Sequence, residues 1–172
     1  MDYRRLLISA ALAGAVAVPA EAAPVAAATD ASGRAVILIP LTLTKIDDRD
    51  FGAVIPSAVS GTVTIDAADG SRTSSGGVIE VPSDVGQRGY FAGGGTASQQ
   101  VLVAVTPPAN LVSTTNAADK VKVLGMSMEG SPLRIIDATR AFFVGVGGTI
   151  QVNANQPEGV YEATFDVTAF YF

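Results

Sequence analysis

The sequence GVYEATFDVTAFYF (residues 159–172) alternates strictly between apolar and polar side chains over most of its length. A period of two residues is the pattern of a β-strand with one buried face and one solvent-facing side. The sequence therefore predicts that the chain ends in a half-buried strand. One face would carry Tyr161, Ala163, Phe165, Val167, Ala169 and Tyr171, and the other Glu162, Thr164, Asp166 and Thr168.

Similar short runs precede this strand along most of the chain. β-branched residues recur between clusters of Gly, Pro, Asn, Asp and Ser, and no segment after residue 22 has a helical period. This pattern predicts an all-β fold, an immunoglobulin-like antiparallel β-sandwich. The predicted strands are 41–45, 61–66, 77–82, 88–92, 99–106, 120–128, 139–146, 148–152 and 159–171, with a hairpin turn at Asp69-Gly70 and a tight turn within GVGGTI (145–150).

The first 22 residues have the three parts of a secretory signal. Arg4 and Arg5 precede an apolar run from Leu6 to Val18, and small residues then allow cleavage after Ala20 or Ala22, of which Ala22 is favoured. The chain is therefore expected to be exported, through the periplasm to the cell surface or the extracellular space. The predicted organisation is a signal peptide at 1–22, an N-terminal extension at 23–39 and a sandwich domain at 40–172.

The composition argues against catalysis and against nucleic-acid binding. There is no Cys and no His, so the common nucleophile–base pairs, ordinary zinc sites and disulfides cannot be built. The formal net charge is −5 and no basic cluster is present, which disfavours a nucleic-acid partner. The acidic run DDRD (47–50) lacks the spacing of a calcium loop and is predicted to be a solvated connector. We expect a protein that is not an enzyme and has no cofactor and no metal site.

Four motifs carry a resemblance to known families. They are DFGAVIP (50–56), GTVTI (61–65), VGGTI (146–150) and the G-x-Y-x-x-T-F-x-V-T-x-x-Y pattern (159–171). With the segment that precedes them, they resemble a family of exported bacterial β-sandwich proteins described as a domain of unknown function. The two ends of the chain also resemble the spore-coat-protein-U-like subunits of archaic chaperone–usher pili. Those subunits usually carry a cysteine pair near the first strand, where this chain has Leu41 and Leu43.

The resemblance to pilus subunits implies a function for the stretch RAVILIPLTLTK (34–45). In such subunits the sandwich lacks its final strand, and the N-terminal extension of the next subunit fills the resulting groove. Pro40 cannot donate a ladder hydrogen bond, so it would separate this donor strand from the domain's own first strand at 41–45. The donor face would carry Ala31, Gly33, Ala35, Ile37 and Ile39.

The resemblance also implies partners for the C-terminal strand. A periplasmic chaperone would pair with this strand through Phe165, Val167, Ala169 and Tyr171, and an outer-membrane usher would assemble the subunits. The other partners would be copies of the same chain or homologous subunits. The predicted function is a structural subunit of a pilus-like or fimbria-like surface filament. The alternative is a self-contained secreted or surface-attached binding module, in which residues 34–44 pair within their own chain.

Overall fold

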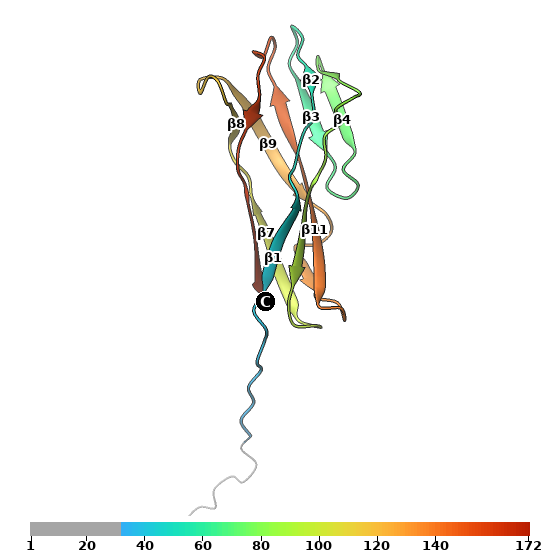
Figure 1. The fold of residues 1–172 in the computed structure, drawn as a ribbon, viewed down its shortest axis with the longest axis vertical. Helices are drawn as coiled ribbons and strands as arrows, with labels where there is room; N and C mark the ends of the chain where they lie inside the picture. Colours follow the sequence, from blue (N-terminus) through green and yellow to red (C-terminus); the bar gives the residue numbers. More distant parts are fainter. Residues whose placement is uncertain (1–31) are drawn as a thin grey trace, which may run out of the picture. The chain divides into compact units, whose positions relative to one another are not determined.

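The computed structural model describes residues 32–172. A boundary lies between Val36 and Ile37, and all the strands belong to the unit Ile37–Phe172 (Figure 1). Within residues 32–172 no helix is long and apolar enough to cross a membrane. The strands are β1 (Thr42–Asp47), β2 (Val54–Ile55), β3 (Gly61–Ile65), β4 (Arg72–Gly76), β5 (Ile79–Glu80), β6 (Gly89–Gly94), β7 (Gln100–Thr106), β8 (Asn110–Ser113), β9 (Lys120–Met128), β10 (Leu133–Ile135), β11 (Ala141–Val152), β12 (Tyr161–Glu162) and β13 (Asp166–Tyr171).

The strands pair antiparallel throughout and form curled sheets. The largest sheet has the order β1-β6-β11-β9-β8-β12, with β3 paired to β11 and β4 paired to β3. A second sheet has the order β10-β7-β13, and β2 forms a short pair with β5. This arrangement is all-β and consistent with a β-sandwich, which confirms the fold class predicted from the sequence.

Alternating burial along the strands builds the hydrophobic core. In β3 and β6 every second residue is buried, as the pleat of a strand requires. The core has two clusters, one around Val63 and Ile65 and the other around Val101 and Val144. β13 packs its half-buried face on the second cluster, while its polar side chains are exposed. The predicted faces of β13 are therefore confirmed.

The predicted turn within residues 145–150 is wrong. β11 runs through this glycine-rich sequence as one continuous strand, Ala141–Val152. Its glycines allow neighbouring backbones to approach closely: a Cβ on Gly145 would lie 2.1 Å from the carbonyl oxygen of Ala67, and a Cβ on Gly147 would lie 2.2 Å from that of Ile65. Glycine within a strand here marks close backbone contact rather than a change of direction.

The predicted C-terminal strand is divided in two. β12 pairs with β8, whereas β13 pairs with β7, and residues 163–165 between them belong to no strand. The alternation of side chains gave no sign of this break. Four short strands, β2, β4, β8 and β10, were also not predicted.

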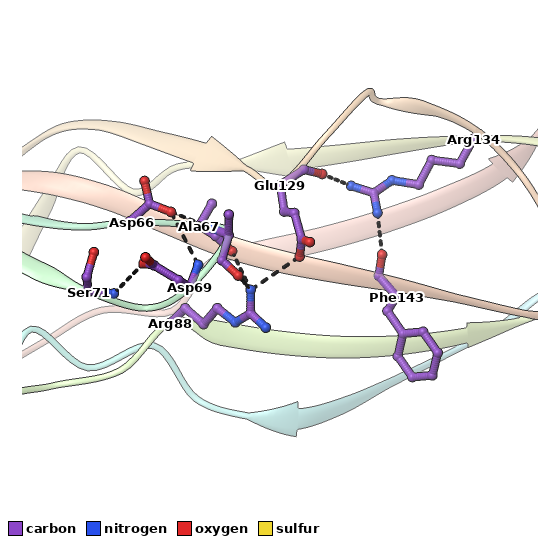
Figure 2. Close-up of polar contacts among 9 residues, drawn as sticks. Asp66, Ala67, Asp69, Ser71, Arg88, Glu129, Arg134 and Phe143 are labelled. Atoms are coloured by element: carbon purple, nitrogen blue, oxygen red, sulfur yellow. Dashed lines mark hydrogen bonds and ion pairs between the residues drawn. The ribbon is translucent and has the colours of Figure 1, made fainter.

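The predicted hairpin turn at Asp69-Gly70 is confirmed. It joins β3 to β4, and Gly70 has a φ of +78°, a conformation that glycine adopts without strain. The Asp66 carboxylate accepts a hydrogen bond of 2.7 Å from the backbone N–H of Ala68, and the Asp69 carboxylate accepts one of 2.8 Å from that of Ser71 (Figure 2). These contacts lower the pKa of Asp69 below its ordinary value, chiefly through the bonds from Ser71.

Candidate functional site: an open groove between two sheet edges

Two strands of the sandwich each present an edge without a ladder. Among the described residues, β1 pairs only with β6, and β13 pairs only with β7. The last strand ends beside the segment that leads into β1 (Figure 1). There the Tyr171 hydroxyl donates a 2.7 Å hydrogen bond to the carbonyl oxygen of Ile39. Farther along, the backbone N–H of Asn155 donates a 2.7 Å bond to the carbonyl oxygen of Ser57. Unpaired edges of this kind are templates for an additional strand.

A groove with a volume of about 1120 Å³ lies between these two links. One wall is the segment 48–56, which follows β1, and the other is the segment 156–165, which contains β12. Four residues of the first core cluster line the groove between the walls, so that the groove opens onto the hydrophobic core of the domain. These four are Leu111, Val121, Ile150 and Val152.

A buried arginine fixes the first wall. The side chain of Arg72 is 3% exposed, and its Nη1 donates hydrogen bonds to the carbonyl oxygens of Phe51 and Ala53, each at 3.2 Å. The same atom donates a 2.7 Å bond to the carbonyl oxygen of Asp84. Because one guanidinium holds three loop carbonyls, the wall is positioned by the fold and needs no ligand to shape it.

The groove is strongly acidic at its margins. Among its lining residues only one is basic, Arg49. Within residues 32–172, no group of three or more acidic side chains is arranged to hold a metal ion. A cationic segment would therefore be favoured in this groove over an anionic one. The acidic lining residues are Asp48, Asp50, Asp84, Glu158 and Glu162.

Arg49 departs from the solvated connector that was predicted for residues 47–50. Its guanidinium carbon lies 4.7 Å from the ring centre of Phe51 and 5.1 Å from that of Phe165. Burial lowers the pKa of Arg49 to about 10, so the side chain still carries its charge at neutral pH. Asp48 and Asp50 on either side are exposed, as predicted. The sequence gave no local sign of the arginine's position, because Phe165 is far away along the chain.

The predicted donor residues carry no strand in this structure. Ala31 lies outside the described residues, and residues 32–41 have no ladder partner. Gly33 and Ala35 are exposed, Ile37 is 93% exposed and Ile39 is 44% exposed. Ile39 is held at its backbone, where its N–H donates a 2.9 Å bond to the Thr96 hydroxyl. The side chain of Ile37 therefore does not occupy the groove of its own chain.

The four predicted residues of the C-terminal strand fall into two settings. Phe165 lines the groove and packs edge-to-face on Phe91, with ring centres 6.1 Å apart. Val167, Ala169 and Tyr171 lie farther along β13 and pack on the second core cluster. The structure thus brings Phe165 together with Arg49 and leaves the other three along the free edge.

A second polar cluster, formed around Arg88 and Arg134, uses its hydrogen-bonding groups within the fold. Arg88 donates hydrogen bonds to the carbonyl oxygens of Ala67 and Ala68 and lies 3.3 Å from the Glu129 carboxylate. Arg134 donates to the carbonyl oxygens of Glu129 and Phe143 (Figure 2). Arg88, just before β6, thus contacts the β3–β4 turn, and Arg134 in β10 connects the residue after β9 to β11. We assign this cluster a structural role, since its hydrogen-bonding groups are used within the fold.

The fold and the groove define the class of protein as an all-β, antiparallel sandwich domain with open sheet edges. Residues 41–171 match the family described as Domain of unknown function (DUF4402), and the chain belongs to this family. This membership confirms the predicted likeness to a domain-of-unknown-function family. No curated protein and no solved structure matches the chain.

Proposed function

We propose that the protein is a structural subunit of a surface filament, assembled by donor-strand complementation. The N-terminal segment of one copy, residues 31–39, would insert as an added strand into the groove of the next copy. The observation that carries this proposal is the open groove over the core, whose walls adjoin β1 and β13, two strands with one ladder partner each among the described residues. Strand addition satisfies such edges through main-chain hydrogen bonds, and side chains on one face fill the groove.

The segment fits the groove in length and in apolar character. The two walls of the groove contain nine and ten residues, and residues 31–39 number nine. Ile37 is 93% exposed and Val36 is 60% exposed, an unfavourable setting for large apolar side chains in water. Burial of Ile37 in a neighbouring copy would contribute about 1.5–3 kcal/mol before ordering costs, and burial of the exposed part of Ile39, which is 44% exposed, would contribute roughly half as much.

The charges of the segment and the groove are complementary. Arg34 is the only charged residue between positions 31 and 39, whereas five acidic residues line the groove. Opposite potentials on two surfaces steer their encounter and disfavour other partners. This complementarity favours a second copy of the chain as the occupant.

The positions of the segment and the groove favour open assembly. Residues 37–39 lie beside Tyr171, at the end of β13, whereas the groove lies beside β12 and the start of β13. A contact between two different surfaces of the same chain is heterologous, and it produces filaments unless the rotation between copies closes a ring.

The same proposal includes export and protection during transit. The signal peptide predicted at residues 1–22 lies outside the described residues, and it would deliver the chain to the periplasm. There a chaperone would cover the free edge of β13 through Phe165, Val167, Ala169 and Tyr171, because an uncovered apolar groove invites aggregation. An outer-membrane usher would then exchange the chaperone for the next subunit.

The variant Ile37→Asp tests the proposal in the mature chain, residues 23–172. Ile37 is 93% exposed, so this change should leave the thermal midpoint of the monomer unaltered and abolish assembly. Val36→Asp is the matched control, because position 36 would face away from the groove in an inserted strand. Light scattering coupled to size-exclusion chromatography would measure the assembly of both variants and of the unchanged chain.

A filament subunit requires large assemblies from the unchanged chain and from Val36→Asp, and monomers from Ile37→Asp. If the mature chain without a substitution stays monomeric at all concentrations, that result would instead support the self-contained binding module. Equal assembly of the two variants would exclude residues 31–39 as the donor.

A further inference from the structure

The groove is lined by an arginine, Arg49, two of whose nitrogen atoms have no hydrogen-bond partner within residues 32–172. The Nε and Nη1 atoms of Arg49 are buried, and neither has a partner among the described residues. The fold nevertheless fixes the position of this side chain, because the rings of Phe51 and Phe165 flank it and two glycines leave room for it. A Cβ on Gly148 would lie 2.9 Å from Nη1, and a Cβ on Gly89 would lie 3.4 Å from the arginine Cβ.

The other arginines with buried contacts are used differently. Arg72, Arg88 and Arg134 each donate hydrogen bonds to two or more backbone carbonyl oxygens. A guanidinium has five donors in a fixed fork, and leaving them unpaired away from water is unfavourable. Arg49 also lines the groove, and its Nη2 is not among the buried atoms without a partner, so a molecule that enters the groove reaches the side chain at Nη2. An incoming group could therefore supply the acceptors that the chain itself does not.

We propose that Arg49 is the polar anchor of the groove and binds main-chain carbonyl oxygens of the strand inserted from a second copy. This inference rests on the proposed function and names the residue that receives the strand. The donor segment 31–39 contains no Asp or Glu, so its carbonyl oxygens are the acceptors that it offers. Residues 31–35 of the donor segment have small side chains except for Arg34, so the Arg49 side chain could reach their carbonyl oxygens. Ile37 and Ile39 would fill the wider apolar part.

An anchor of this kind affects binding and stability in different directions. Replacing Arg49 by Met keeps an unbranched side chain between the two phenylalanine rings and removes an uncompensated charge. Relief of the unpaired buried atoms offsets the loss of the guanidinium contacts with the two rings, so the free domain should keep its stability. The same change removes the hydrogen bonds to the inserted strand. A purely structural arginine would behave in the opposite way, because its loss would lower stability.

The test uses the mature chain carrying Ile37→Asp, whose groove is free, and a fluorescent peptide with the sequence of residues 31–40, which contains no Asp or Glu. Peptide affinity is measured by anisotropy, and the thermal midpoint of the peptide-free protein is measured in parallel. The variants are Arg49→Met and Arg49→Lys, with Arg140→Met as control, because Arg140 is exposed and does not line the groove. Arg49→Lys keeps the positive charge but lacks the planar guanidinium with its five N–H donors. This variant serves as the test if Arg49→Met does not fold.

We expect Arg49→Met to weaken peptide binding by about 10- to 100-fold, the loss associated with a charge-assisted hydrogen bond. Arg49→Lys should lie between this variant and the unchanged groove, and Arg140→Met should bind normally. The thermal midpoint of Arg49→Met should not fall. Normal affinity in both Arg49 variants would overturn the anchor while leaving the groove as a strand-binding site. A lower midpoint with normal affinity would assign Arg49 a structural role. Absence of peptide binding to every protein, including the parent, would overturn the proposed function itself.

Discussion

A second copy of the donor segment, attached behind Phe172, should fill the groove within one chain and stabilise the domain. The variant carries residues 28–40 after a short Gly/Ser linker. In its control, the Ile37 and Ile39 of the added copy are changed to Ser. The C-terminus is a suitable attachment point because β13 runs from the groove at Phe165 toward the end of the chain. A chain reversal there would bring the copy back along the free edge of β13.

The size of the effect follows from the two isoleucines. Full burial of one such side chain contributes about 1.5–3 kcal/mol, so the pair contributes about 3–6 kcal/mol relative to the control. Both proteins have the same linker and nearly the same chain entropy, which therefore cancels in the comparison. For a domain of about 150 residues, each kcal/mol shifts the thermal midpoint by about 2–4 °C. The expected difference between the two proteins is about 6–24 °C.

Differential scanning calorimetry would measure the two midpoints, and light scattering would verify that the self-filled protein is a monomer. The serine control corrects for any effect of a longer C-terminus. Midpoints that agree within about 2 °C would refute the reasoning, since the isoleucines would then remain in water. A self-filled protein that still assembles as readily as the unchanged chain would refute it equally.

Three further outcomes are expected. Tyr171→Phe removes the hydroxyl that donates to the carbonyl oxygen of Ile39 and accepts from the N–H of Thr96 at 2.8 Å, and urea unfolding should show a loss of about 1–3 kcal/mol. The pKa of Asp137 lies below its ordinary 3.8, chiefly because the side chain accepts a bond from the Thr139 hydroxyl. Its stabilising contribution is therefore complete above that value and lost as the pH falls through the folded-state pKa. The stability difference between the unchanged protein and Asp137→Asn should accordingly shrink below about pH 3.8 in acid titrations of unfolding. Arg34→Glu should slow assembly in stopped-flow light scattering, about tenfold at low ionic strength and less at high salt, since salt screens the acidic groove; equal rates at both salt concentrations would contradict this.

The fold class could be read from the sequence because the alternation in β3 and β13 is a local property. Side chains at every second position identify a strand and its buried face whatever its neighbours are. The continuous strand predicted at 159–171 was wrong because the change of partner from β8 to β7 is a tertiary event. The alternation of apolar and polar residues continues through residues 163–165, so the sequence does not indicate where β12 ends and β13 begins.

The candidate site was predictable only in part. The sequence showed an apolar run before Pro40, and in the structure the side chain of Ile37 in this run is 93% exposed. The donor function of this run remains a prediction. Arg49 was not predictable, because DDRD has the composition of a solvated loop and the burial of the arginine depends on Phe165. The glycines of β11 were misread for a related reason. These glycines allow the backbone of β11 to lie close to the carbonyl oxygens of Ala67 and Ile65, and no pattern in the neighbouring sequence indicates this contact.

On the proposed mechanism, the two surfaces that join copies are different and remain separate until assembly. Each added copy fills one groove and brings another, so a growing filament always has an empty groove at one end and an unused donor segment at the other. The empty groove is lined by Leu111, Val121 and other residues of the first core cluster, and it borders an uncovered strand edge. A free subunit has the same exposed groove, which is why the proposal requires a covering partner before assembly. Occupation of the groove is then linked to stability, because a ligand that binds only the folded chain raises its free energy of unfolding. Subunits within a filament should therefore resist unfolding more strongly than free subunits.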